Sequence, residues 1–271
     1  MKILILGGTR DALEIAHRLI KQHEVIYSIV GIVRQPDLNC QILSGGFSTQ
    51  QTENGEKTFT DGAAGLKWYL QQSNCDLLID ATHPYASQIS CNAVKATDNN
   101  QVTLLRYDRP AWESPIRKQP TGKEVSDDSW IEYDTLDALL DNLKKFRKPF
   151  FSIGRSILSA THLRTDSQQW VIRSAGLNGS DLETVGEQGI LHINALGPFH
   201  FEDELALFKK LAVDALVTKN SGGQSVSAKL VAAKHLNIPI LMLARPEKPA
   251  VRYCFSTIDA LIEKINNSLV L

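Results

Sequence analysis

Short apolar segments rich in β-branched residues alternate with segments of helical periodicity along nearly the whole chain. The first pair is a strand over residues 2–6 and a helix that places Ala12, Ala16 and Leu19 on one face, with Gly7-Gly8-Thr9 between them. Such alternation is typical of parallel βαβ units. The sequence therefore predicts an α/β fold with mostly parallel sheets. Further strands are expected at residues 25–30, 75–81, 102–106, 150–153, 170–174, 190–194, 215–218 and 238–243, and further helices at 62–72, 201–211 and 227–235.

A polar, proline-rich segment interrupts this alternation. It begins at Arg109-Pro110-Ala111-Trp112 and continues to about residue 128, which makes it the best candidate for a domain boundary. We therefore expect two α/β domains, residues 1–112 and residues 113–271. Residues 35–60 are rich in Gln, Asn, Ser, Thr and Gly, and we expect a loop there with at most one short strand.

The charge and cysteine content exclude several classes of protein. The chain has 271 residues, of which 29 are basic and 30 acidic, so there is no global attraction to nucleic acid or to an anionic membrane. Its four cysteines show no Cys-x-x-Cys spacing, which favours reduced thiols over a zinc site or a disulfide framework. No apolar run is long enough for a signal-peptide core or a membrane span. We expect a cytoplasmic protein without a bound metal.

Three turns that directly follow strands are candidate ligand sites, because ligands of open parallel sheets bind beyond the carboxyl ends of the strands. The first comprises Gly7, Gly8, Thr9 and Arg10, and it is either a phosphate-binding turn or a tight turn that needs glycine for geometry alone. Beyond the second strand, Gly31 and Arg34 occupy the region that reads a nucleotide ribose. Arg34 favours a 2′-phosphate, whereas the nearby Asp37 leaves the choice between NADPH and NADH open.

The second turn contains Ala81, Thr82, His83 and Tyr85. Pro84 predicts that His83 is the N-cap of the next helix. The His and Tyr side chains either donate protons to a ligand or stack on its ring, or they only complete a capping turn.

The third turn follows the strand at residues 215–218. It places a cation, an amide, a hydroxyl and two glycines together, a set that suits an anion or a cofactor amide unless the turn is only a solvated loop. Its residues are Lys219, Asn220, Ser221, Gly222 and Gly223.

Several arginines lie near these turns. Each alone is most often a solvated charge, but together they could bind a polyanion. Three are candidates for binding carboxylates: Arg109, Arg155 and Arg245.

These motifs resemble those of the precorrin-6A reductases of cobalamin biosynthesis, including their cobalt-precorrin-6A counterparts. The resemblance covers nearly the whole chain, and its most specific part is Asp80-Ala81-Thr82-His83-Pro84-Tyr85-Ala86 with Asn92-Ala93. The other matching segments, in order along the chain, are Arg109-Pro110-Ala111-Trp112, Ile153-Gly154-Arg155, Gly197-Pro198-Phe199 with Glu204, Thr218-Lys219-Asn220-Ser221-Gly222-Gly223 and Arg245-Pro246.

The resemblance implies two Rossmann-like domains with the active site in the cleft between them, and hydride transfer from NADPH or NADH to a tetrapyrrole macrocycle that carries many carboxylates. On this basis we expect the turns at Gly7, Ala81 and Asn220, with Gly31 and Arg34, to bind the nucleotide, and Lys219, His83 and Tyr85 to orient or protonate the macrocycle. This chain has Asp11 where family members usually have Glu, and Ile32 where they commonly have Arg. If that Arg binds the 2′-phosphate, either Arg34 replaces it or the preference moves toward NADH. The resemblance leaves the oligomeric state open.

Two other functions remain as alternatives. One is a short-chain-dehydrogenase-like reductase of another substrate, although none of the six tyrosines has a lysine four residues further on. The other is a non-catalytic dinucleotide sensor, which would bind NAD(P)H without oxidising it.

Overall fold

The structure, a computed structural model, describes residues 1–31, 36–52, 55–98, 101–113, 116–118, 124–126, 129–175, 185–186, 189–223 and 227–267. The chain divides into two compact units, the first formed by Met1–Pro110 with Pro246–Leu271 and the second by Ala111–Arg245. This division differs from the two consecutive domains that the sequence predicted, because the C-terminal segment returns to the first unit. The second unit is thus inserted into the first.

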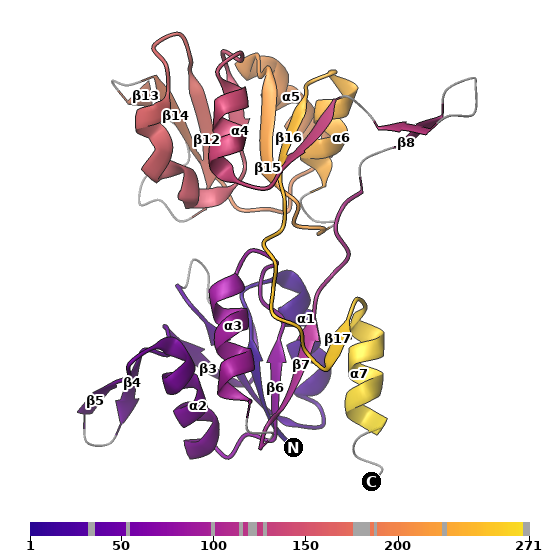
Figure 1. Ribbon diagram of the computed structural model, residues 1–271. Coiled ribbons are helices and arrows are strands. Elements are labelled where there is room, and N and C mark those ends of the chain that lie inside the picture. The colour runs from indigo at the N-terminus through magenta and orange to yellow at the C-terminus, as the bar shows by residue number, and fades with distance from the viewer. Residues whose placement is uncertain are drawn as a thin grey trace. The chain divides into compact units, whose positions relative to one another are not determined.

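The sheet of the first unit has six strands in the order β17-β7-β6-β1-β2-β3, and every pairing between them is parallel (Figure 1). The strand bounds are β1 Lys2–Leu6, β2 Glu24–Ile29, β3 Gln41–Ser44, β6 Leu77–Asp80, β7 Thr103–Tyr107 and β17 Tyr253–Phe255. Because β17 pairs with β7, the strand that precedes the inserted unit, the C-terminal segment is an integral part of this sheet.

Helices cover both faces of this first sheet. Helix α1 (Arg10–Leu19) packs with α7 (Ile258–Asn267) in one apolar core, and α2 (Gly62–Gln72) packs with α3 (Ser87–Ala96) in another on the opposite face. The bounds of β1 and α2 agree with those expected from the sequence, whereas α7 was not predicted.

Residues 36–60 contain more strand than expected. Besides β3 at the sheet edge, β4 (Thr49–Thr52) and β5 (Gly55–Thr58) form an antiparallel hairpin. The expectation of at most one short strand is therefore wrong. The polar hairpin residues lack the apolar alternation by which a half-buried strand is recognised.

The second unit contains a seven-stranded sheet in the order β10-β16-β15-β11-β12-β14-β13, in which only β13 runs antiparallel to its neighbour. Helices again cover both faces, with α4 and the 3₁₀ helix η1 on one and α5 and α6 on the other. The bounds are β10 Trp130–Tyr133, α4 Leu136–Leu143, β11 Pro149–Phe151, η1 Gly154–Leu163, β12 Trp170–Ser174, β13 Val185–Gly186, β14 Ile190–Asn194, α5 Phe201–Leu211, β15 Ala215–Lys219, α6 Ala228–His235 and β16 Ile240–Leu243, with a separate hairpin of β8 Ile116–Lys118 and β9 Glu124–Ser126.

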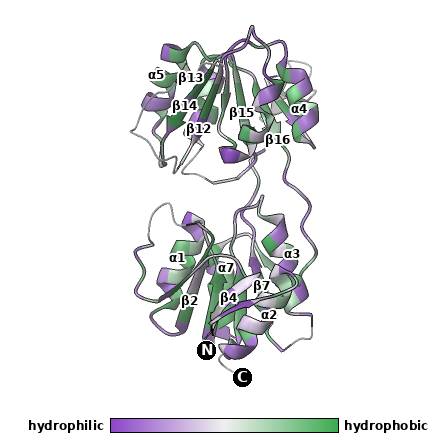
Figure 2. Ribbon diagram, turned by 90° about the vertical axis from the view of Figure 1, so that its left-hand side faces the viewer, coloured by the Kyte–Doolittle hydropathy of each residue, from purple (hydrophilic) through white to green (hydrophobic). Residues whose placement is uncertain are grey.

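The structure confirms the predicted α/β class with mostly parallel sheets. Among the labelled strands of the second sheet, β12, β14, β15 and β16 are largely hydrophobic, as expected for strands with helices on both faces (Figure 2). Within the described ranges, no helix has the length and apolar composition that a membrane span requires.

Each sheet has a point at which the strand order reverses. In the first unit, β1 leads to β2 on one side and β6 leads to β7 on the other, so the turns after β1 and β6 diverge. In the second unit, β11 leads to β12 and β15 leads to β16 in the same divergent manner. Such switch points open a crevice at the carboxyl ends of the strands, where doubly wound proteins bind ligands. All three candidate turns predicted from the sequence lie at these two points.

Candidate functional site

The glycines after β1 are required by local geometry. Gly8 has a φ of +98°, a conformation that side chains rarely adopt. A Cβ on Gly7 would lie 2.1 Å from Cζ of Tyr27, whose ring from β2 packs beneath the turn. The Gly8 N–H donates to the Tyr27 hydroxyl oxygen at 2.9 Å. The requirement for glycine therefore exists with or without a bound phosphate.

Thr9 joins the two turns at the switch point of the first unit. It is the N-cap of α1, with its Oγ1 accepting from the Ala12 N–H at 3.0 Å, and the same hydroxyl donates to the carbonyl oxygen of Ala81 at 3.0 Å. Arg10, the first residue of α1, is exposed. The start of a helix thus faces the crevice, with backbone N–H groups and a positive dipole end that suit an anion.

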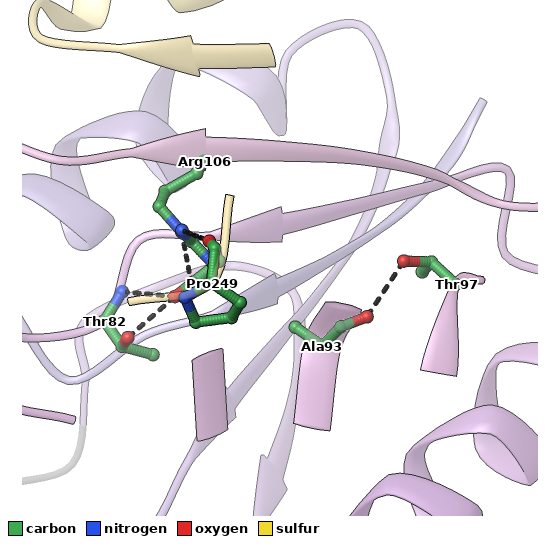
Figure 3. Close-up of polar contacts among 6 residues, drawn as sticks. Thr82, Ala93, Thr97, Arg106 and Pro249 are labelled. Atoms are coloured by element: carbon green, nitrogen blue, oxygen red, sulfur yellow. Dashed lines mark hydrogen bonds and ion pairs between the residues drawn. The ribbon is translucent and has the colours of Figure 1, made fainter. Parts of the chain in front are cut away.

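Asp80, the last residue of β6, organises the neighbouring turn. Its side chain is fully buried, and its Oδ1 accepts from the Thr82 hydroxyl at 2.7 Å and from the Thr82 N–H at 3.3 Å. Its Oδ2 accepts from Nε of Arg106 at 3.1 Å, and Nη1 of Arg106 donates to the carbonyl oxygen of Pro249 at 2.6 Å (Figure 3). Thr82 is therefore held by a buried ion pair.

Asp80, Arg106, Asp11 and Tyr27 are residues of this site that sequence reasoning did not assign. The one available signal was Asp80 at the end of an apolar strand, because a buried carboxylate needs a partner. The sequence does not say which of the arginines is that partner.

Arg109 contacts the start of α1. Its Nη1 lies 2.7 Å from Oδ2 of Asp11, with 13% and 25% of the two side chains exposed. The structure thus places this predicted carboxylate-binding arginine beside an acidic residue of the first turn of α1.

His83 is not the N-cap of α3, which corrects the sequence-based expectation. The N-cap is Ala86, and the helix begins at Ser87. The Ala86 N–H donates to the His83 carbonyl oxygen at 2.8 Å, and the Tyr85 N–H donates to Nδ1 of His83 at 3.3 Å, so a separate turn precedes the helix. The His83 and Tyr85 rings lie 5.6 Å apart between centroids, both half-buried.

A shallow pocket lies between the two turns of this unit. Burial and the nearby Asp11 carboxylate raise the pKa of the Tyr107 phenol, one of the lining groups, so that phenol is neutral at physiological pH. The lining residues are Thr9, Asp11, Ala81, Thr82, Pro84, Tyr107, Asp108 and Arg109. This small pocket lies at the switch point and beside the start of α1, the position at which doubly wound proteins bind ligands.

The turn after β15 lies at the switch point of the second unit. Lys219 ends the strand half-buried, and burial lowers the pKa of its ammonium group. Asn220 and Ser221 are buried, and Gly222 has a φ of +70°. Opposite, after β11, Gly154 has a φ of +76° and the exposed Arg155 donates from Nη2 to the Ala175 carbonyl oxygen at 3.3 Å.

Asn220 and Arg245 contact protein groups in this unit. The Asn220 amide accepts from the Trp112 N–H at 2.8 Å and donates to the Trp112 carbonyl oxygen at 3.0 Å. Nε of Arg245 donates to the Asn220 carbonyl oxygen at 2.7 Å. These bonds connect segments that the sequence analysis treated as separate motifs.

A buried charged cluster lies beneath the same unit's helices. Nη2 of Arg173, from β12, donates to Oε2 of Glu204 at 2.9 Å, and the guanidinium carbon lies 3.7 Å from the centroid of the Phe199 ring. Lys229, in the first turn of α6, is 6% exposed, and burial, with the nearby Arg173 charge, lowers its pKa to about 7. Arg173 thus connects Glu204 with Phe199 of the Gly197-Pro198-Phe199 segment, and Lys229 is a member of the cluster that the sequence analysis did not predict.

The structure brings the predicted residues together in two groups, one in each unit. Gly31 follows β2 with a φ of +74°, and Arg34 lies outside the described residues. In the portion of the chain that the structure describes, no three His, Cys, Asp or Glu side chains are grouped as metal ligands would be. The first group contains Gly7, Gly8, Thr9, Arg10, Ala81, Thr82, His83 and Tyr85, and the second contains Lys219, Asn220, Ser221, Gly222, Gly223, Arg155 and Arg245.

The fold and the position of the candidate turns define a protein of the doubly wound, Rossmann-like class, with a topological switch point in each sheet. A family model described as "Precorrin-6x reductase CbiJ/CobK" matches residues 2–266, and the chain belongs to this family.

Individual relatives agree with this family. The chain is 34% identical over 268 residues to a Precorrin-6A reductase of Sinorhizobium sp, covering 97% of this chain and 92% of that protein. It is also 34% identical to a Precorrin-6A reductase of Rhodococcus erythropolis, with 92% and 90% covered. Relatives named Cobalt-precorrin-6A reductase are 23% to 24% identical. A solved structure titled "CobK precorrin-6A reductase" has a TM-score of 0.78 at 26% identity, covering 98% of this chain and 96% of the other.

Proposed function

We propose that this chain is a precorrin-6A reductase that uses NADPH or NADH. The observation that carries the proposal is the switch point of the first unit in a chain of the CbiJ/CobK family. There the start of α1 and the Thr82 turn line one small pocket, and the glycine turn after β1 directly precedes that helix. When bound, the reduced nicotinamide supplies the hydride.

The residues proposed to bind the nucleotide are mainly in the first unit. Backbone groups of Gly7, Gly8, Thr9 and Arg10 would contact its phosphates at the start of α1, and the Ala81-Thr82 turn would line the opposite side. Gly31, at the end of β2, and Arg34 would lie toward the adenosine ribose. The sequence also assigns Asn220, Ser221, Gly222 and Gly223 to nucleotide contacts. The Asn220 side chain bonds to Trp112, whereas the positive φ of Gly222 suits a turn that exposes backbone N–H groups.

The proposed substrate is a tetrapyrrole with several carboxylates. Arg155 is exposed after β11, at the same switch point as Lys219, and is proposed to bind a carboxylate. Arg109 and Arg245 are assigned the same role, although each also holds a protein group, Asp11 and the Asn220 carbonyl respectively.

Hydride addition to a double bond also requires a proton, and Lys219, His83 and Tyr85 are the proposed donors or orienting groups. Burial lowers the pKa of Lys219, which makes its ammonium group a better proton donor. His83 and Tyr85 are neighbours on the Thr82 turn, held by the bond between the Tyr85 N–H and Nδ1 of His83.

The test is an absorbance assay with the purified protein and precorrin-6A. NADPH and NADH are compared, each with cobalt-free and cobalt-loaded substrate. We expect nucleotide oxidation together with a change in the macrocycle spectrum. The reaction should be fastest with the cobalt-free substrate, because the relatives of higher identity are named Precorrin-6A reductase and those of lower identity Cobalt-precorrin-6A reductase. No spectral change under all four conditions would disprove the proposal, and nucleotide binding alone would indicate a sensor.

A further inference from the structure

Asn220 lies where both chain segments that connect the two units join the second one. We define the outgoing linker as residues 108–113 and the returning linker as residues 245–252, which span the unit boundaries after Pro110 and Arg245. The Asn220 side chain bonds to both polar groups of the Trp112 peptide, at 2.8 and 3.0 Å. Its carbonyl oxygen accepts from Nε of Arg245 at 2.7 Å. A single residue therefore contacts both linkers.

The Asn220 amide is engaged by the protein itself. The residue is 4% exposed, and its own N–H donates to the Leu243 carbonyl oxygen of β16 at 3.2 Å. The side-chain oxygen accepts and the side-chain nitrogen donates, so the Asn220 amide is both acceptor and donor in its pairing with Trp112. The amide group of a bound nucleotide could take the place of the Trp112 peptide only if both bonds between Asn220 and Trp112 were broken.

The outgoing linker is also held through the Trp112 ring. This ring packs against the apolar core on the α5 and α6 side of the second sheet, and Nζ of Lys229 lies 5.7 Å from its centroid. Trp112 is thus fixed by its backbone through Asn220 and by its ring through the core. The two contacts together set where the outgoing linker meets the second unit.

The groups beside Asn220 in the chain are those of the proposed reaction. Lys219 precedes it at the end of β15, and the buried Ser221 follows it, with the Ser221 N–H donating to the Lys219 carbonyl oxygen at 2.8 Å. A shift of Asn220 would move Lys219 on the same short turn.

We propose that Asn220 is a positioning residue: it holds both linkers against the turn that carries Lys219 and so fixes the place of that turn, instead of contacting the cofactor. The expected effect on turnover rests on the proposed function, whereas the expected effect on the linkers does not.

The experiment compares the full-length wild-type protein with Asn220→Ala and Asn220→Asp. Hydrogen–deuterium exchange is measured for peptides that cover residues 108–113 and 245–252, with β12, residues 170–174, as the internal reference. We expect faster exchange in the outgoing linker of Asn220→Ala, because this variant loses both side-chain bonds to Trp112. The returning linker should change little, because alanine keeps the backbone carbonyl that accepts from Arg245, and β12 should not change. Asn220→Asp keeps the acceptor for the Trp112 N–H but, when ionised, cannot donate to the Trp112 carbonyl, so it should also loosen the outgoing linker.

The kinetic measurement separates positioning from cofactor contact. For Asn220→Ala we expect kcat to fall on the order of tenfold to a hundredfold, because small displacements of a reacting group have effects of that size. KM for the nucleotide should change by less than about twofold, since uniform binding is unaffected. Asn142→Ala is the matched control, because Asn142 lies on the exposed side of α4 and its side chain donates to the Ala138 carbonyl oxygen of the same helix.

Each outcome decides the proposal. Unchanged exchange in the outgoing linker would overturn it, whatever the activity, and so would a raised nucleotide KM with unchanged kcat, which would mark Asn220 as a cofactor contact. A loosened outgoing linker with unchanged kcat would also overturn it. Urea unfolding of each variant shows whether it folds. If Asn220→Ala does not fold, the exchange and kinetic measurements are made on Asn220→Asp. A wild-type protein inactive with precorrin-6A would refute the proposed function, while the exchange data would still decide the linker contacts.

Discussion

Arg106 and Asp80 form an ion pair inside the first unit, with 3.1 Å between Nε and Oδ2 and only 4% and 0% of their side chains exposed. The pair connects two functional parts of the unit, because Asp80 also accepts from Thr82 and Arg106 also donates to the Pro249 carbonyl oxygen of the returning linker. Moving two charges out of water costs free energy that their mutual attraction can fail to offset. We therefore expect the main contribution of this pair to be the positions of the groups that it holds.

Asp80→Asn should destabilise the protein strongly. The asparagine keeps an acceptor for Thr82 but leaves the buried Arg106 guanidinium without a counter-charge, at a cost of about 3–5 kcal/mol in the free energy of unfolding. Urea unfolding would measure this loss. Asp141→Asn is the control, because the Asp141–Lys144 pair is exposed and its removal should have little effect. Equal effects of the two substitutions would contradict the buried-pair interpretation.

Gly7→Ala should be much more damaging than Gly46→Ala. A Cβ on Gly7 would lie 2.1 Å from Cζ of Tyr27, whereas a Cβ on Gly46 would meet no other atom within 4 Å and the φ of Gly46 is not positive. Tyr27 is fully buried, so its ring can move away only by disturbing the core. Overpacking of this kind costs ~1–3 kcal/mol or more. Thermal unfolding of the two variants would show whether the turn tolerates a methyl group.

Lys229 should make stability depend on pH. Its pKa is about 7 in the folded protein and 10.5 in the unfolded chain, so between those values the unfolded chain binds the proton that the folded protein lacks. Stability should therefore rise with pH across that window, by up to ~1.4 kcal/mol per pH unit from this one group.

Lys229→Met should remove this rise, because the thioether side chain has no proton to bind. The measurement is the free energy of unfolding in urea at several pH values, compared between wild type and variant. Lys234→Met, at an exposed position of the same helix, should retain the wild-type slope. A wild-type slope in Lys229→Met would rule out this residue as the source.

Lys219→Ala should reduce turnover far more than it changes folding. If the Lys219 ammonium donates or directs the proton, its loss should lower kcat by ~10²-fold or more. Because burial lowers its pKa, wild-type activity should decline on the alkaline side at a lower pH than an ordinary lysine would dictate. Steady-state kinetics against pH would test both expectations, and unchanged kinetics would remove Lys219 from the proposed reaction.

The local pattern of the sequence was enough to predict the α/β class, the positions of most strands and the three turns that lie at the switch points. Strand and helix periods are properties of neighbouring residues, and glycine turns after apolar strands are visible in the same short windows. The segment at residues 36–60 was mispredicted because its polar hairpin carries neither period. The N-cap assigned to His83 was wrong because the backbone forms a further turn, through the Ala86 and Tyr85 N–H groups, before α3 begins.

The sequence by itself determined the fold class and, through its ordered motifs, the resemblance to precorrin-6A reductases. Only the tertiary structure decided that the C-terminal segment returns to pair β17 with β7. It also decided which residues act together: Asp80 with Arg106, Asp11 with Arg109, and Asn220 with Trp112. The physical reason is that the members of these three pairs lie between 26 and 108 residues apart in the chain, so their pairing depends on strand order and burial, which no local pattern encodes.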